Sequence, residues 1–181
     1  RKLEILVREI QEKNEVLNFI SESDALTGCM NRRGFIEKTL QMNRDHEGEE
    51  LLILFADLDH LKEINDSFGH IEGDFSIRHC AEVLKKVVGA DGIVGRIGGD
   101  EFCVVTLGNL KDGQQIIERI REESDAFNCT SDKEYYVELS AGCTSVICRN
   151  GLVIADALRE ADRALYEVKK LRRNSVKKIR L

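Results

Sequence analysis

The sequence predicts an α/β domain of the α+β type, with a central mixed β-sheet and helices covering one face of that sheet. Two observations support this fold class. The 181 residues are 42% hydrophobic and 33% charged, which is the balance of a globular domain with one core. Their apolar periodicity changes along the chain in the order strand, helices, hairpin, helix, strand, helix, strand.

Short apolar or β-branched runs are predicted as strands: residues 51–57, 93–97, 102–107, 135–147 and 175–180. The dipeptide Gly98-Gly99 lies between the second and third runs and favours a two-residue hairpin turn. The fourth run has four apolar residues in alternation: Val137, Leu139, Ala141 and Cys143. Alternation of this kind predicts that one side of the strand is buried.

Helical periodicity occurs in five segments that precede, separate or follow these strands along the chain. They are residues 33–42, 61–67, 73–88, 110–126 and 152–171. In the third of these, six apolar residues share one face: Ile77, Cys80, Ala81, Leu84, Val87 and Val88. Such a stripe predicts that the helix packs on the sheet.

An additional helix is predicted over residues 3–20, so the chain divides into an N-terminal helix, residues 1–21, and a compact domain, residues 22–181. Five apolar residues of this helix follow a seven-residue repeat interrupted by Lys13: Leu3, Leu6, Ile10, Leu17 and Ile20. The repeat is short. A coiled-coil linker and a helix packed on its own domain both remain open.

Composition narrows the class of protein further. The net charge of −6 argues against a dedicated nucleic-acid binder, which would carry a basic face. No apolar run reaches the ~18 residues that span a bilayer. The six cysteines form no C-x-x-C pair, which favours reduced thiols over a zinc site. Reduced thiols predict a cytoplasmic location, and the start at Arg1 without an initiator Met predicts a fragment of a longer protein, for which a membrane anchor stays open.

Two acidic groupings carry the candidate chemistry. Asp57 ends the apolar strand and Asp59 comes two residues later, while Asp100 and Glu101 follow the glycines of the hairpin. If the hairpin lies beside the end of that strand, these carboxylates meet and repel one another unless a cation is present. Hard oxygen ligands favour Mg²⁺ or Mn²⁺, as in the metal sites of phosphoryl and nucleotidyl transfer. The alternative is a surface turn with solvated acids.

Cations that could bind phosphates occur in two places. Lys169 and Arg173 are four residues apart and can share a helix face, and Lys62 lies five residues beyond Asp57. The alternative for the first pair is a solvated basic helix end that complements the helix dipole.

Four segments, in order and in spacing, resemble the GGDEF domain family over residues 22–178. The motif that names the family is Gly98-Gly99-Asp100-Glu101-Phe102. The other matching segments are Asp24–Phe35, Asp57–Asp74 and Ala161–Asn174. Within them, Ala25, Cys29 and Arg172 depart from the residues usual in the family, and none of these departures removes a catalytic group.

The resemblance implies a ferredoxin-like palm as in nucleotide cyclases, a sheet surrounded by helices, and a signalling helix in front of it. It also implies residue roles. The metal ligands would be Asp57, the carbonyl of Leu58, Asp100 and Glu101, with Asp100 and Glu101 also catalytic. The substrate-binding residues would be Lys62, Asn65, His70, Asp74, Gly98, Gly99, Lys169 and Arg173.

The activity implied is that of a diguanylate cyclase, which condenses two GTP into cyclic di-GMP and two pyrophosphates with Mg²⁺ or Mn²⁺. Each domain would hold one GTP, so the partner would be a second copy in a homodimer, controlled by an upstream sensory domain. The alternatives are a catalytically inactive GGDEF domain that binds GTP and regulates a partner, a cyclase with a single-nucleotide product, and a purely structural dimerisation module. Many family members bind product through an R-x-x-D site, but here Gly89 and Gly92 occupy those two positions.

Overall fold

The computed structural model describes residues 7–8, 13 and 22–179, with side chains up to residue 171. The five apolar residues of the repeat predicted over residues 3–20 lie outside the described residues. Among the described helices, none is long and apolar enough to cross a membrane.

The sheet has four strands in the order β2-β3-β1-β4. Their bounds are Glu50–Leu58 for β1, Ile93–Arg96 for β2, Glu101–Leu107 for β3 and Leu139–Ile147 for β4. All three strand pairs are antiparallel, so the prediction of a mixed sheet was wrong. Strand β4 is also shorter than predicted, because residues 135–138 form the loop that leads into it.

The helices confirm the predicted segments and extend most of them. Their bounds are Arg32–Asp45 for α2, Leu61–Phe68 for α3, His70–Val88 for α4, Leu110–Thr130 for α5 and Ile154–Ile179 for α6. The predicted strand at 175–180 was wrong, because residues 175–179 belong to α6. No glycine or proline occurs between Ile154 and Ile179, so the local sequence contains no strong helix breaker.

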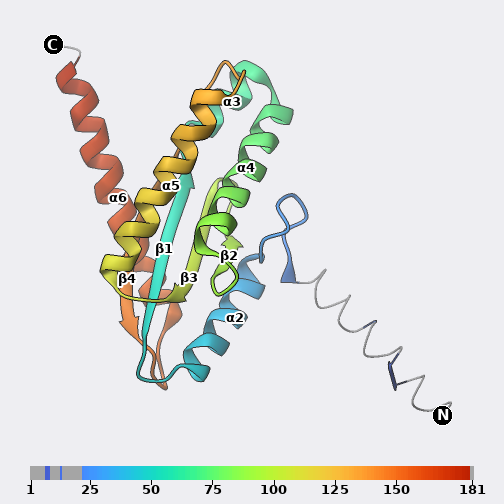
Figure 1. Cartoon of the computed structure of the whole chain (residues 1–181), viewed down its shortest axis with the longest axis vertical. Helices are drawn as coiled ribbons and strands as arrows, with labels where there is room; N and C mark the ends of the chain where they lie inside the picture. Colours follow the sequence, from blue (N-terminus) through green and yellow to red (C-terminus); the bar gives the residue numbers. More distant parts are fainter. Residues whose placement is uncertain (1–6, 9–12, 14–21, 180–181) are drawn as a thin grey trace.

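Helices cover both faces of the sheet, as Figure 1 shows, and not one face as the element order suggested. Helices α4 and α5 close one core with alternate β1 residues Leu52, Leu54 and Ala56. Helices α2 and α6 close the other core, against Leu51 and Ile53. The β1-α3α4-β2-β3-α5-β4 order is the βαββαβ pattern of a ferredoxin-like fold, and α2 and α6 are additions to it.

The hairpin between β2 and β3 has a wider turn than the two residues predicted. Residues 97–100 lie between the strands, and the carbonyl of Glu101 accepts hydrogen bonds from the backbone of Ile97 at 2.9 Å and Gly98 at 3.4 Å. The turn therefore includes Asp100, which lies one residue before β3.

Helix α6 lies unusually close to the sheet at Gly142 of β4. A Cβ atom built on Gly142 would lie 2.1 Å from the backbone nitrogen of Leu165, which no real side chain could tolerate. The missing side chain lets the α6 backbone rest directly on β4. Lys169 lies one turn beyond Leu165 on the same helix, so this contact sets its position relative to the sheet.

Candidate active site

Asp57 and Glu101 lie directly opposite each other on the antiparallel strands β1 and β3. Side chains alternate along a strand, so Asp57 shares a face with Leu51 and Ile53, and that face is covered by α2 and α6. Two like charges in opposite positions on one face destabilise a sheet. The fold thus brings together the two acidic groupings that the sequence predicted would meet.

Asp59 and Asp100 complete what we call the acidic cluster, defined as Asp57, Asp59, Asp100 and Glu101. The backbone N–H of Leu58 donates to the carbonyl of Asp100 at 3.0 Å, which ties the hairpin turn to the end of β1. Asp59 accepts a 2.6 Å hydrogen bond from the hydroxyl of Ser140 on β4. Three neighbouring strands therefore fix the cluster.

Ionisation is disfavoured at two members of the acidic cluster. Burial raises the pKa of Asp57, and the charges of Asp100 and Asp59 raise it further, against the lowering effect of Lys169. Burial also raises the pKa of Glu101, together with the charges of Asp100, Asp57 and Asp162. The cluster is short of positive charge, which is the electrostatic condition of a cation site.

Lys169 reaches this cluster from α6. Its ammonium group donates a hydrogen bond to Asp57 and lies 3.4 Å from the carboxylate of Asp59. The sequence predicted Lys169 as a phosphate ligand, and the structure places it among the acids. Lys62 is exposed on α3, and the side chain of Arg173 lies outside the described residues.

The glycines of the turn leave room for the acids. A Cβ atom on Gly98 would lie 2.4 Å from the carboxylate of Glu101, so that carboxylate folds back over Gly98. At Gly99 the space is open, and its carbonyl accepts hydrogen bonds from the guanidinium of Arg96 at 2.8 and 3.2 Å. The sequence predicts no role for Arg96, although it is a cation two residues before the paired glycines.

Arg96 also binds Asp24, a residue for which the sequence suggested no function beyond the family match. Burial opposes ionisation of Asp24, but hydrogen bonds from Thr27 and Arg96 outweigh it and lower the pKa of Asp24. The Arg96 and Asp24 side chains are only 15% and 23% exposed. A partly buried ion pair of this kind fixes geometry better than a solvated one.

The residues implied for base recognition lie at the α3–α4 corner. Asn65 is on α3, while His70 and Asp74 lie exposed in the first turns of α4. A Cβ atom on Gly73 would lie 1.9 Å from Oδ1 of Asn65, so Gly73 makes room for the Asn65 side chain. The structure therefore places Asn65 against the start of α4.

A second polar group supports this corner from the loop before β4. Glu72 of α4 forms an ion pair with Lys133 at 2.7 Å and accepts a short hydrogen bond from the hydroxyl of Tyr135. Burial and the Glu72 hydrogen bond raise the pKa of Tyr135 to about 12, so its hydroxyl stays protonated and donates. The ring of Tyr135 packs on Phe68 at 5.0 Å between centroids.

The donor chemistry of the acidic cluster suits a hard divalent cation, because carboxylate oxygens are the ligands that Mg²⁺ and Mn²⁺ prefer. Across residues 22–171, however, no three His, Cys, Asp or Glu side chains are arranged to hold a metal ion together. The ammonium of Lys169 lies between Asp57 and Asp59. The assignment of Asp57, Leu58, Asp100 and Glu101 as metal ligands stays a prediction.

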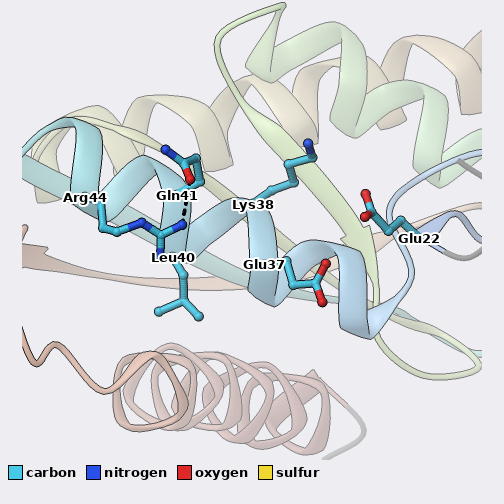
Figure 2. Close-up of a pocket in the computed structure, with 6 residues that line it drawn as sticks. All are labelled: Glu22, Glu37, Lys38, Leu40, Gln41 and Arg44. Atoms are coloured by element: carbon cyan, nitrogen blue, oxygen red, sulfur yellow. Dashed lines mark hydrogen bonds between the residues drawn. The ribbon is translucent and has the colours of Figure 1, made fainter. Parts of the chain in front are cut away.

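Two open cavities lie elsewhere on the domain. One, of about 360 Å³, runs along the outer side of α2 and includes Glu22 and Glu37, as Figure 2 shows. Within it, Arg44 donates a 2.6 Å hydrogen bond to Gln41. The other, of about 400 Å³, lies between α4 and α5 beside His79. Neither cavity is lined by a residue that the sequence analysis assigned to the site.

Comparison with known proteins identifies the family of this chain. The family described as "Diguanylate cyclase, GGDEF domain" matches residues 21–175. The chain is 38% identical over 172 residues to Diguanylate cyclase DgcP of Escherichia coli K12, a match that takes in 92% of this chain and 50% of that protein. It is also 29% identical over 177 residues to Cyclic di-GMP phosphodiesterase NbdA of Pseudomonas aeruginosa, covering 96% of this chain and 22% of that protein.

Among solved structures, the fold is similar to the coiled coil and GGDEF domain of DgcB from Caulobacter crescentus, solved in complex with c-di-GMP. The TM-score is 0.81 at 25% identity, and the match covers 93% of this chain and 91% of that one. The chain spans half or less of the length of the two curated relatives described above. The acidic hairpin, the ferredoxin-like sheet and these matches together show that the chain belongs to the GGDEF domain family of diguanylate cyclases.

Proposed function

We propose that this domain condenses two GTP molecules into cyclic di-GMP and two pyrophosphates, with Mg²⁺ or Mn²⁺, as a homodimer in which each domain holds one GTP. The observation that carries the proposal is the placement of Asp57 directly opposite Glu101, with Asp100 in the adjoining turn. A fold gains nothing in stability from three carboxylates in this arrangement. A cation-dependent reaction supplies a reason to keep them.

The divalent cation would be held by Asp57, the Leu58 carbonyl, Asp100 and Glu101. GGDEF diguanylate cyclases use a divalent metal, which when bound neutralises phosphate charge and orients the reacting phosphate.

The remaining chemistry belongs to the side chains of the domain. The 3′-oxygen of one GTP forms a bond to the α-phosphorus of the other, and the bond between the α-phosphorus and the β-phosphate oxygen breaks. Glu101 would accept the proton of the 3′-hydroxyl, since burial and the neighbouring carboxylates raise its pKa and make it a better base than an ordinary glutamate. The same step repeated in the opposite sense closes the ring. The domain otherwise contributes by positioning the reactants, so no covalent enzyme intermediate is required.

Substrate binding is divided between two regions of the domain. Asn65 and Asp74, with His70 nearby, would hydrogen-bond the edge of guanine at the α3–α4 corner. The phosphates would be held at the other region by Lys62, Lys169 and Arg173. The base would thus be bound by residues of α3 and α4, and the phosphates by residues at the start of α3 and on α6.

The alternative is a GGDEF domain that binds GTP without turnover and regulates a partner. NbdA matches 96% of this chain but is named for phosphodiesterase activity, so a match to this domain does not by itself imply cyclase turnover. The intact set of acids in this chain favours catalysis.

The deciding experiment is incubation of the purified protein with GTP and Mg²⁺, followed by chromatographic identification of the product. We expect cyclic di-GMP and pyrophosphate in a ratio of one to two. The variants Asp57→Asn and Asp100→Asn should lose at least about a hundredfold in turnover while remaining folded. Asp125→Asn, at an exposed position on α5, is the matched control and should keep full turnover.

Binding of GTP without any product would instead support the regulatory alternative. A single-nucleotide cyclic product would reassign the reaction. Normal turnover by a folded Asp100→Asn variant would contradict the assignment of the metal site.

A further inference from the structure

Lys169 bridges the two aspartates at the end of β1. Its ammonium donates to Asp57 and lies 3.4 Å from Asp59, and all three side chains are at most 25% exposed. Partial burial strengthens these interactions relative to those of a solvated pair. Lys169 is therefore a positive charge held inside the acidic cluster, and not a free arm at the end of a helix.

The other charges that face this position are mostly negative. Asp100 and Asp59 act on Asp57, and Asp100 and Asp162 act on Glu101. The charge of Arg32, from α2, acts on Glu101 in the opposite sense. The positive charges described at the cluster are those of Arg32 and Lys169, and of these two it is Lys169 that contacts Asp57 directly.

The position of Lys169 is set by backbone packing. The α6 backbone rests on Gly142 of β4 at Leu165, one turn before Lys169, with no side chain between the two elements. β4 pairs with β1 in a register that puts Ser140 opposite Asp57. The close packing of α6 on β4, together with the pairing of β4 and β1, therefore holds the ammonium beside the carboxylates. The contact follows from the fold of the domain.

From this contact we propose that Lys169 is the resident counter-ion of the acidic cluster and exchanges partners when the nucleotide arrives. The inference rests on the proposed function, in that the cluster is taken to bind a divalent cation and the nucleotide to bring phosphates. A divalent cation and the ammonium compete for the oxygens of Asp57. A cation that binds alone must displace Lys169, which then loses its anionic partners.

The nucleotide changes this balance, because its phosphate oxygens offer Lys169 a new set of anions. Cation and nucleotide therefore bind with positive coupling, and each raises the affinity of the domain for the other by the same factor. Lys169 is in this sense a positioning residue with two states. Bound to Asp57, it opposes occupation of the cluster by a cation alone, and bound to phosphate it supports the loaded site.

The test is to measure Mn²⁺ binding by electron paramagnetic resonance, with and without α,β-methylene GTP, a GTP analogue that cannot be turned over. The variant is Lys169→Met, and the matched control is Lys170→Met, which removes the same charge from the next, exposed residue. Lys169→Arg serves as the conservative variant. None of these measurements requires catalytic activity.

We expect opposite effects of Lys169→Met in the two states. Without nucleotide, Mn²⁺ should bind about tenfold more tightly than in the wild type, and with the analogue it should bind about tenfold more weakly. Lys170→Met should move neither value, and Lys169→Arg should keep the weak nucleotide-free binding.

The inference is overturned if Lys169→Met leaves nucleotide-free Mn²⁺ binding unchanged or weakens it, including the case in which no variant binds Mn²⁺ at all. A failure of the proposed function looks different. In that case the variants show the two opposite shifts, but the wild-type protein makes no cyclic di-GMP from GTP.

Discussion

The guanidinium of Arg96 donates hydrogen bonds to both carboxylate oxygens of Asp24, at 3.2 and 3.3 Å. The same guanidinium donates to the carbonyl of Gly99 at 2.8 and 3.2 Å. Arg96 thereby joins the segment that enters the domain to the turn that carries Asp100. The Arg96 side chain is therefore one direct link between the entering segment and the turn, beside the backbone hydrogen bonds of Met30 to β2.

Replacing Arg96 by Ala should therefore reduce both stability and turnover. We expect the free energy of unfolding to fall by about 2 kcal/mol, because a charged, partly buried set of hydrogen bonds is lost. Turnover should fall about tenfold or more, with a smaller change in KM, because the turn is loosened while base contacts persist. Urea denaturation and steady-state kinetics measure the two effects.

The variant Asp24→Asn removes the charge that pairs with Arg96 but leaves the hydrogen bonds from Arg96 to the Gly99 carbonyl in place. Its stability cost should be present at pH 7 and should shrink as the pH falls below 3.8, because the folded-state pKa of Asp24 lies below that value. The control for Arg96→Ala is Arg78→Ala, which removes an arginine from an exposed position on α4. Unchanged kinetics in Arg96→Ala would show that the turn holds its shape without the guanidinium.

Replacing Glu101 by Gln should stabilise the fold while abolishing activity. The substitution removes a charge that faces Asp57 across the strand pair, so the free energy of unfolding should rise by about 0.5 kcal/mol at pH 7. The pKa of Glu101 in the folded state lies above its ordinary value of 4.5, so the repulsion is fully present above the folded-state pKa and absent below about 4.5.

The gain in stability should accordingly vanish at pH 4, which urea denaturation at the two pH values tests. Glu118→Gln, at an exposed position on α5, should show no gain at either pH. A loss of stability in Glu101→Gln at pH 7 would mean that its interaction with Arg32 outweighs the repulsion.

Replacing Gly73 by Ala should impair base recognition with little effect on stability. The new methyl group would lie 1.9 Å from Oδ1 of Asn65 and would push that side chain out of place. The helix propensity of alanine, about 1 kcal/mol better than that of glycine, offsets much of the crowding. We expect KM for GTP to rise about tenfold with a smaller change in kcat, because a site that loses a hydrogen-bonding group loses discrimination.

Asn65→Ala should reproduce this change in KM, and both variants should narrow the preference for GTP over ATP. If Gly73→Ala binds GTP normally although Asn65→Ala does not, Asn65 adapts to the methyl group and the space at Gly73 is not needed for recognition.

Feedback inhibition by cyclic di-GMP through an R-x-x-D site should be absent. The two positions hold Gly89 and Gly92, and glycine offers neither the guanidinium fork nor the carboxylate. Gly89 ends α4 with a φ of +76°, a conformation that an arginine would adopt only under strain. Product titration in the steady-state assay should show no non-competitive inhibition, and tight binding of product at residues 89–92 would refute the prediction.

Specific activity should rise with protein concentration, because in the proposed function each domain holds only one of the two reacting GTP molecules. A parallel dimeric coiled coil fused before Arg1, in register with Leu3 and Leu6, should raise activity at low concentration. A fusion shifted by three or four residues should change that gain. Activity per molecule that is independent of concentration and of both fusions would contradict a dimeric active site.

The sequence alone predicted the fold class and most of the elements, while its assignment of the site chemistry stays a prediction. The apolar run before Asp57 and the glycine pair before Asp100 were enough to predict that two acidic groupings meet. Local patterns succeed here because strand and helix periodicities are properties of neighbouring residues. The prediction of a strand at residues 175–180 was wrong, because α6 continues through residues 175–179. No glycine or proline interrupts the helix before that point.

Only the tertiary structure decided what surrounds the acids. Lys169 lies 112 residues from Asp57, and Arg96 lies 72 residues from Asp24, so no local pattern could pair them. Both contacts depend on strand register and on how closely α6 approaches β4 at Gly142, which are results of packing over the whole domain. The same packing put helices on both faces of the sheet, because α2 and α6 bury the face that the ferredoxin-like core leaves open.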